Sequence, residues 1–132
     1  RVALLDLLIA TEYWLILFAE HRVDHARGCG TSCGGGFRPV PGARLTLLPP
    51  TAEEPASGRR GGPASPVEEV PEGEVGELYL AGPMVGAIGY TDAARNEGAF
   101  VDLIVSPDGP PVRHFRTRDL ARRRADGSLE YC

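Results

Sequence analysis

The chain has 132 residues and a net charge of −4, from 14 basic and 18 acidic side chains. This length corresponds to about one domain, and the acidic balance gives no overall attraction to nucleic acid or to anionic membranes. Every basic residue is an arginine, so this chain alone offers no lysine to grip a phosphate or to stabilise an acyl-transfer transition state.

The chain ends and the cysteines suggest a cellular context. The sequence starts at Arg1 rather than Met and ends at Cys132, directly after a strand-like segment, so we expect a piece of a longer polypeptide. Three cysteines, two of them the C-x3-C pair Cys29 and Cys33, are too few for a disulfide framework and supply only half of a zinc site. We interpret them as reduced thiols of an intracellular protein, which predicts a cytoplasmic location.

An apolar stretch at residues 2–19 raises the question of a membrane segment. Asp6 and Glu12 interrupt it, and each charge near a bilayer centre costs about 2.5 to 3.5 kcal/mol. No cationic leader or small-residue cleavage site follows. We therefore expect no membrane partner, and we predict a strand buried on both faces at 2–8 and a second strand at 13–19.

A glycine-rich loop at residues 28–36 offers backbone amides and hydroxyls that suit an anion. It lacks the Gly-Lys-Ser/Thr ending of a phosphate loop, so we interpret it mainly as a mobile connection. An extended stretch at 37–42 and a strand at 44–48 follow. The composition of 49–73 then shifts to Pro, Gly, Ala, Ser and Glu, which bury too little apolar surface to offset the entropy of ordering. We predict that this segment is a disordered surface loop.

The C-terminal half alternates short strands with turns. Residues 92–97 can form a short helix with Asp92 as its N-cap. Asp126-Gly127 is the turn of the clearest hairpin signal in the chain. The predicted strands lie at 77–81, 99–105, 112–117 and 129–131.

Asp119 is one carboxylate in a strongly cationic stretch. The surrounding basic residues are Arg113, Arg116, Arg118 and Arg122 to Arg124. We expect Asp119 to stay ionised, and either to accept paired hydrogen bonds from a vicinal diol or to be held by an arginine fork. The residues alone leave both interpretations open. A third hypothesis, a nucleic-acid surface, is less well supported because Phe115 is the only stacking ring among these cations.

Several short motifs follow one another along this half of the chain. They are Gly76-Glu77-Leu78-Tyr79-Leu80, Gly82-Pro83, Gly89-Tyr90, Phe115-Arg116-Thr117-x-Asp119-Leu120 and Asp126-Gly127-x-Leu129-Glu130-Tyr131. In this order they resemble the adenylate-forming superfamily, above all the adenylation domains of nonribosomal peptide synthetases and acyl-CoA-synthetase-like ligases. Upstream, residues 6–12 and 38–42 resemble the family's Asn-x-Tyr-Gly-x-Thr-Glu and Gly-Arg-Pro-Ile-Pro motifs.

The resemblance implies a mixed α/β, mostly β fold. Residues 1–36 would end an α/β subdomain, and residues 37–132 would form a distorted β-barrel subdomain that carries the 49–73 loop. It also implies a reaction in which ATP and a carboxylic or amino acid give an acyl adenylate, whose acyl group then passes to a thiol. The thiol would belong to coenzyme A or to a phosphopantetheine carrier, with the carrier possible as a domain of the same chain.

The resemblance also assigns candidate site residues. Asp119 matches the carboxylate that binds the ribose hydroxyls, and Glu12 matches the magnesium ligand. Thr11 matches a hydroxyl donor to the phosphate of the adenylate. Asp6 stands where an Asn lies near the adenine edge, and Tyr131 matches an aromatic beside the nucleotide. The family's catalytic lysines fall outside this segment, so we expect no catalytic residue here and no adenylate synthesis by this chain alone.

Three positions depart from the family pattern. Leu8 replaces the Tyr that stacks on adenine, and Ile9 replaces a Gly in a tight loop. Arg118 replaces the Gly directly before the ribose carboxylate, where a positive φ becomes costly for a side chain. These departures support an alternative hypothesis, in which the fold is kept as a catalytically inactive scaffold or remnant.

Overall fold

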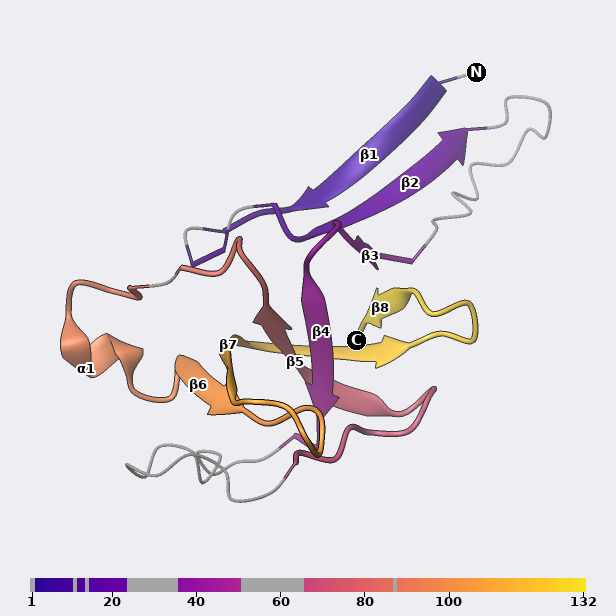
Figure 1. The fold of residues 1–132 in the computed structure, drawn as a ribbon. Helices are drawn as coiled ribbons and strands as arrows, with labels where there is room; N and C mark the ends of the chain where they lie inside the picture. The colour runs from indigo at the N-terminus through magenta and orange to yellow at the C-terminus, as the bar shows by residue number, and fades with distance from the viewer. Residues whose placement is uncertain (1, 11, 14, 24–35, 51–65, 87) are drawn as a thin grey trace.

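The structure is a computed structural model that describes residues 2–10, 12–13, 15–23, 36–50, 66–86 and 88–132, which form two antiparallel sheets and one short helix (Figure 1). The smaller sheet contains β1 (Val2–Leu8), β2 (Leu17–Val23) and β3 (Arg38–Pro39). The larger sheet contains β4 (Arg44–Leu48), β5 (Val75–Ala81), β6 (Phe100–Leu103), β7 (Val112–Arg123) and β8 (Leu129–Tyr131). The helix α1 (Ala93–Asn96) precedes β6.

The second strand of the small sheet begins later than the sequence predicts. A strand was expected at 13–19, but β2 begins at Leu17, opposite Leu8 of β1. The chain has to reverse between the two strands, and the amide of Ala10 donates to the carbonyl of Tyr13 at 3.0 Å within that reversal. Tyr13 instead forms an isolated bridge with Val85, so this part of the apolar run joins the small sheet to the β5–α1 segment.

The expected burial of β1 on both faces is wrong for the side chains that the structure describes. Leu5 is 60% exposed and Leu7 is 51% exposed. The described residues give β1 one neighbour, β2, and its apolar pattern alone did not reveal that Leu5 and Leu7 would stay exposed.

The larger sheet is ordered β4-β5-β7-β6, and β8 pairs with β7 beyond it. In Figure 1 this sheet curls, with β4 crossing in front of β5 and β7. β5 lies inside the sheet, between β4 and β7, and its residues from Gly76 to Ala81 are all buried. The strands expected at 44–48, 77–81 and 129–131 are confirmed, and the strand expected at 112–117 extends to Arg123.

Two apolar clusters cover the two faces of the large sheet. Leu78 and Leu80 of β5 pack in the larger cluster, whereas Tyr79 packs in the smaller one with Val101 and Leu103. This division follows from strand geometry, because successive side chains point to opposite faces. The larger cluster also contains Leu17 of β2, together with Tyr13 and Ile16 from the loop between β1 and β2. The two sheets therefore share one core.

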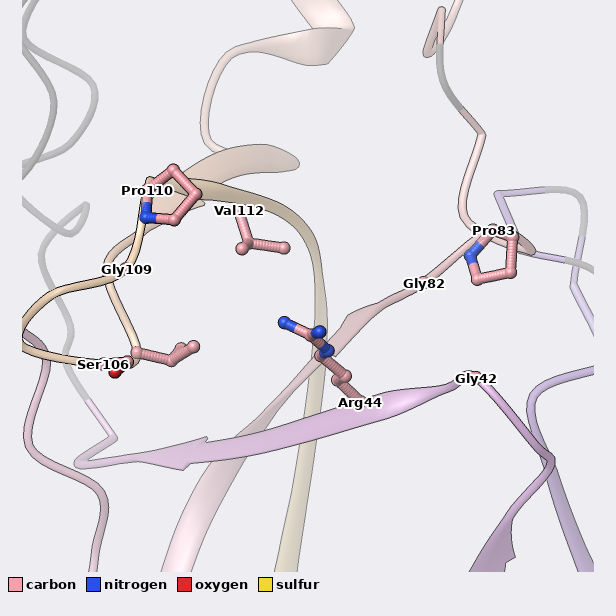
Figure 2. A pocket seen from close by; sticks show the side chains of 9 residues that line it. Gly42, Arg44, Gly82, Pro83, Ser106, Gly109, Pro110 and Val112 are labelled. Atoms are coloured by element: carbon pink, nitrogen blue, oxygen red, sulfur yellow. The ribbon is translucent and has the colours of Figure 1, made fainter.

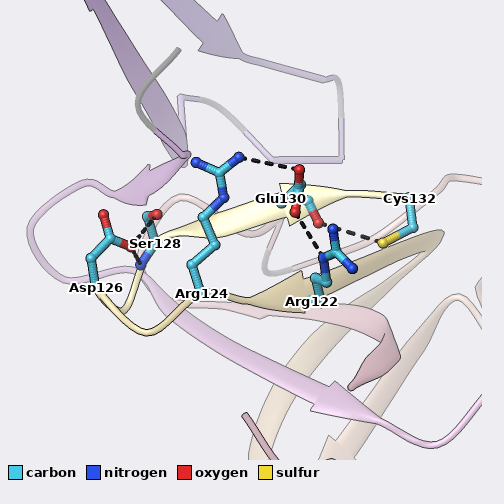
Figure 3. A network of polar contacts seen from close by, with 6 residues as sticks. All are labelled: Arg122, Arg124, Asp126, Ser128, Glu130 and Cys132. Carbon is cyan, nitrogen blue, oxygen red and sulfur yellow. Dashed lines mark hydrogen bonds and ion pairs between the residues drawn. The ribbon is translucent and has the colours of Figure 1, made fainter. Parts of the chain in front are cut away.

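The predicted helix and hairpin are confirmed. Asp92 caps α1 by accepting a hydrogen bond from the amide of Ala94 at 3.0 Å. In the β7–β8 turn, Asp126 accepts from both the amide and the hydroxyl of Ser128, at 2.9 and 2.5 Å (Figure 3). These bonds favour the ionised carboxylate, and with the nearby cations they hold the pKa of Asp126 below its ordinary value.

The segment 49–73, predicted to be disordered, lies partly outside the described residues. Its last part, 66–73, follows the larger sheet: the amide of Val67 donates to Ile104 at 2.8 Å, and that of Val70 donates to Leu47 at 2.9 Å. The glycine-rich loop at 28–36 lies outside the described residues except for Gly36. The structure describes no helix that is long and apolar enough to cross a membrane.

His114 of β7 is one of the polar side chains that the large sheet buries. His114 has no exposed surface, its Nδ1 donates to the carbonyl of Val112 at 2.7 Å, and its Nε2 lies 3.4 Å from the hydroxyl of Thr46. A carbonyl can only accept, so Nδ1 carries the proton of the neutral ring. Burial disfavours the charged ring and lowers the pKa of His114 below its ordinary value.

The burial of His114 predicts weaker folding in mild acid. The unfolded chain takes up this proton near pH 6.5, whereas the folded chain takes it up only at lower pH. The contribution of His114 is therefore present above pH 6.5 and is lost as the pH falls through the folded pKa, with a slope of at most about 1.4 kcal/mol per pH unit. Urea unfolding between pH 7.5 and 5 measures this slope, and His114→Gln should reduce it. An unchanged slope in the variant would contradict the assignment.

Candidate functional site

A bulge in β7 shapes the candidate site. β5 and β7 pair regularly from Val75 opposite Arg122 to Glu77 opposite Leu120, and they pair again at Tyr79 opposite Arg116. Between the last two pairs, β5 contributes one residue and β7 contributes three, 117–119. The two extra residues have no partner in the ladder, so this part of β7 must leave the plane of the sheet.

Asp119 lies in this bulge, and side-chain and backbone contacts fix the segment around it. The hydroxyl of Thr117 donates to the carbonyl of Leu78 at 2.9 Å and accepts from the amide of Asp119 at 3.0 Å. Arg118, between them, has a φ of +69°, the only positive φ recorded for a non-glycine residue in the described part of the chain. The bulge therefore leaves Asp119 exposed to solvent.

Two tyrosines from distant parts of the chain lie near Asp119. Its charge contributes to a raised pKa of both Tyr13 and Tyr131, although burial is the larger cause for each. Glu12 adds to the effect on Tyr13. The hydroxyl of Tyr131 is buried with no hydrogen-bond partner among the described residues, and its ring packs edge-on against Phe37. The structure thus gathers Glu12, Asp119 and Tyr131, three of the predicted site residues, around Tyr13.

Glu12 is held from both its backbone and its side chain. Its carbonyl accepts from the amide of Gly86 at 2.8 Å, and its carboxylate accepts from the hydroxyl of Tyr90. Asn96 of α1 fixes Tyr90 in turn, accepting from its amide at 2.7 Å and donating to its carbonyl at 2.9 Å. A Cβ at Gly89 would lie 2.4 Å from the Asn96 side chain, so a glycine is needed there.

Sequence reasoning missed Tyr13, Tyr90 and Asn96 as parts of this site. Gly89-Tyr90 stood out only as a motif, and its contact with Glu12 joins residues 78 positions apart. Asn96 gave no signal in the sequence, because a polar residue in a short exposed helix is unremarkable. Only the folded chain brings these groups together.

The other predicted positions are less central. Asp6 lies in β1 opposite Ala19, with an exposed side chain. Thr11 lies outside the described residues. Leu8, at a position expected to stack on adenine, packs against the larger core cluster, and Ile9 is 49% exposed. The roles of Asp6, Thr11, Glu12, Asp119 and Tyr131 stay predictions.

The arginines near Asp119 mostly engage glutamates instead. Arg116 pairs with Glu77, Arg123 lies 3.5 Å from Glu69, and the side chains of Arg122 and Arg124 both reach Glu130 (Figure 3). No arginine in the described part of the chain forms an ion pair with the carboxylate of Asp119. Asp119 is exposed, and both interpretations of its carboxylate stay predictions.

A separate hollow of about 470 Å³ opens between β4 and the turn before β7 (Figure 2). Arg44 points into it and is its one charged lining residue. Its lining is Gly42, Arg44, Gly82, Pro83, Val105, Ser106, Gly109, Pro110 and Val112. None of the predicted site residues lines this hollow.

The described residues contain no group of three or more His, Cys, Asp or Glu side chains that could enclose a metal ion. Magnesium does not require such a cage, because it commonly binds through one or two carboxylates and takes its other ligands from phosphates and water. A single oriented carboxylate, as in Glu12, fits that pattern.

Comparison with curated proteins finds nonribosomal peptide synthetases. The synthetase agiA of Aspergillus flavus is 51% identical over 63 residues, which cover 47% of this chain and 1% of the relative. The dimodular nonribosomal peptide synthase of Bacillus subtilis is 47% identical over 66 residues, covering 49% of this chain and 3% of the relative. No protein-family model matches the chain. The chain therefore spans a very small part of the curated relatives it matches.

Comparison with solved structures shows the same kind of fold. NpsA of Klebsiella oxytoca, in complex with 3-hydroxyanthranilyl-AMSN, matches with a TM-score of 0.67 and 19% identity over 98% of this chain and 23% of its own. PA1221, a nonribosomal peptide synthetase protein containing adenylation and PCP domains, matches with a TM-score of 0.65 and 23% identity. The match covers 100% of this chain and 23% of PA1221. CmiS6 matches with a TM-score of 0.64 and 26% identity, and the match covers 98% of this chain and 27% of CmiS6. The expected mostly β fold is confirmed as part of an adenylation-domain architecture.

The backbone of Arg118 predicts that its replacement by glycine stabilises the chain. A side chain at positive φ costs about 1 to 2 kcal/mol, and glycine avoids that cost. Arg118→Gly should therefore raise the urea midpoint of unfolding. Arg122→Gly, in the regular part of the same strand, is the matched control. It should lower the free energy of unfolding by about 0.5 to 1 kcal/mol, and the urea midpoint with it. Equal destabilisation by both changes would contradict the strained backbone at Arg118.

The contact between Tyr90 and Glu12 predicts a measurable titration shift. The hydrogen bond to the Glu12 carboxylate is the main cause of the raised pKa of Tyr90. Glu12→Gln removes that negative charge, so the pKa of Tyr90 should fall toward its usual value of about 10. Carbon NMR of ζ-labelled tyrosine resolves the 4 tyrosines. Tyr79, whose pKa is raised to about 12 mainly by burial, is the internal control and should not move.

Proposed function

Because this chain is related in sequence and in fold to the adenylation domains of nonribosomal peptide synthetases, we propose that it forms the nucleotide-binding part of an enzyme that activates a carboxylic or amino acid with ATP. The observation that carries the proposal is the bulge of β7, which presents an exposed carboxylate, Asp119, near two partly or fully buried tyrosines.

The chemistry of Asp119 suits a ribose. A carboxylate has two oxygens that can each accept a hydrogen bond from one of two neighbouring hydroxyls, and such charge-assisted bonds are stronger than neutral ones. The contact of Thr117 with the Asp119 amide fixes the backbone at this position. Tyr131 and Tyr13 supply apolar surface next to it. These features support ribose binding by Asp119 with Tyr131 beside the nucleotide.

Glu12 suits the phosphate end of the same ligand. When bound, a magnesium ion would neutralise charge on the phosphate oxygens, and the Glu12 carboxylate would hold it. Tyr90 orients that carboxylate by donating to it, and Asn96 orients Tyr90. Thr11, one residue before Glu12, would donate its hydroxyl to the phosphate. Asp6 would accept from the amino group of adenine.

The partners of the relatives extend the proposal to a thiol acceptor. PA1221 contains adenylation and PCP domains, and NpsA has been studied fused to ThdA as an adenylation-PCP di-domain. We therefore place a carrier-protein domain as the acceptor of the acyl group from the complete protein, with coenzyme A as the alternative.

A catalytically inactive scaffold is the second candidate. It is favoured by Leu8, which packs against the core where the family stacks an aromatic on adenine, and by the strained Arg118. A scaffold that has lost the nucleotide would keep the bulge without using the Asp119 carboxylate, so ribose binding separates the two candidates.

The proposal predicts that this chain distinguishes adenosine from 2′,3′-dideoxyadenosine. Two hydrogen bonds from ribose hydroxyls to an ionised carboxylate should favour adenosine by about tenfold or more. NMR titration of the labelled chain with each nucleoside measures both dissociation constants. Asp119→Asn should remove most of this preference, because an amide oxygen is a weaker acceptor than a carboxylate.

Asp108→Asn is the matched control for this titration, since Asp108 is an exposed aspartate in the turn before β7. It should leave the preference for adenosine unchanged. Equal affinity of the unchanged chain for the two nucleosides would overturn the ribose role of Asp119 and support the scaffold.

A further inference from the structure

The large sheet buries one bidentate ion pair. Arg116 donates to Glu77 through two parallel hydrogen bonds, Nε to Oε1 at 2.5 Å and Nη2 to Oε2 at 2.7 Å. The two side chains are 2% and 6% exposed. The other ion pairs in the described part of the chain are much more exposed, for example Arg122 with Glu130 at 47% and 34%. Water therefore screens the charges of the Arg116–Glu77 fork much less than those of these exposed pairs.

The fork also occupies a particular place in the ladder. Arg116 is the last residue of β7 that pairs with β5 before the bulge, and Glu77 pairs with Leu120, the first residue after it. The guanidinium on one side and the carboxylate on the other thus link the two ends of the three-residue segment 117–119. The bulge is closed by backbone pairing at both ends and by this side-chain fork across its base.

Burial of this fork is not explained by stability alone. Removing two charges from water costs several kcal/mol per ion, and well-packed apolar residues often serve as well or better. A bidentate fork does offer fixed geometry, because the planar guanidinium and the carboxylate meet in one orientation. Tyr79 packs against the pair, with the Arg116 guanidinium 6.0 Å from its ring centre, and its pKa is raised to about 12 by burial and then by Glu77.

We propose that Glu77 and Arg116 are positioning residues for Asp119. Their fork fixes the length and the direction of the β7 bulge, and so sets where the Asp119 carboxylate stands relative to the ligand. The proposal rests on the proposed ribose-binding function of Asp119. A merely structural ion pair would stabilise the sheet without affecting how the carboxylate selects its ligand.

The test compares variants that keep the sheet but change the fork. Glu77→Gln combined with Arg116→Met removes both charges together, which avoids leaving one buried charge unpaired. Arg116→Lys keeps the positive charge and loses the fork geometry. Arg122→Met combined with Glu130→Gln is the matched control, because it removes an exposed pair of similar length, 2.7 Å, between β7 and β8, together with the contact of Arg124 with Glu130.

The first readout is the ratio of the dissociation constants of 2′,3′-dideoxyadenosine and adenosine. If the fork positions Asp119, the ratio falls from about tenfold or more toward one in both fork variants, while the affinity for dideoxyadenosine stays the same. The control pair keeps the original ratio. A structural role would weaken both nucleosides alike and leave the ratio unchanged, and that result would overturn the proposal.

The second readout does not depend on the nucleotide. The amide of Asp119 donates to Thr117 inside the bulge, so its hydrogen exchange reports the local geometry. The fork variants should speed its exchange relative to amides of β6, and the control pair should not. If the unchanged chain shows no preference for adenosine, the proposed function fails, while this exchange still decides the positioning role. Unchanged exchange at Asp119 in the fork variants would overturn it.

Discussion

The irregular pairing of β5 with β7 is the constraint from which the candidate site follows. β5 lies between two strands and is buried along most of its length, with apolar clusters on both faces. An extra residue in such a strand would push a side chain into a filled core or leave a buried backbone group unpaired. The longer β7 can accept the extra residues because its bulge projects out of the sheet, and Asp119 lies in that projection.

The shared core then brings the rest of the site to the bulge. Tyr13 and Ile16 belong to the chain between β1 and β2, yet they pack in the same cluster as Leu78, Leu80 and Phe115. The ring of Tyr13 lies 5.7 Å from that of Phe115, which is on β7 a few residues before the bulge. Glu12 follows as the neighbour of Tyr13 in the chain. The position of a candidate metal ligand is thus decided by the packing of the tyrosine next to it.

Charge is divided between two settings in this fold. At the surface, Glu130 lies between Arg122 and Arg124, and pairs of this kind contribute little to stability and are screened by salt (Figure 3). In the sheet, Arg116 and Glu77 meet without solvent and hold one geometry. Four of the six arginines around Asp119 therefore form ion pairs with glutamates, namely Arg116, Arg122, Arg123 and Arg124.

The sequence by itself determined most strands, the capped helix, the β7–β8 hairpin and the family resemblance, because each depends on residues that are close together in the chain. Asp92 and Asp126 act through hydrogen bonds to immediate neighbours, and Gly127 takes the positive φ of its turn, so their roles can be read locally. Arg118 was recognised as a position that favours glycine, and its positive φ agrees with that.

Only the tertiary structure decided how far β7 extends, where its bulge falls, that Leu5 and Leu7 of β1 stay exposed, and which groups surround Asp119. These features depend on register and on packing between segments that are far apart in the sequence, such as Glu12 with Tyr90 or Glu77 with Arg116. The apolar pattern of a strand does not specify which strand it will pair with or where the register between them will shift. For this reason the sequence identified some of the site residues but not their arrangement in space.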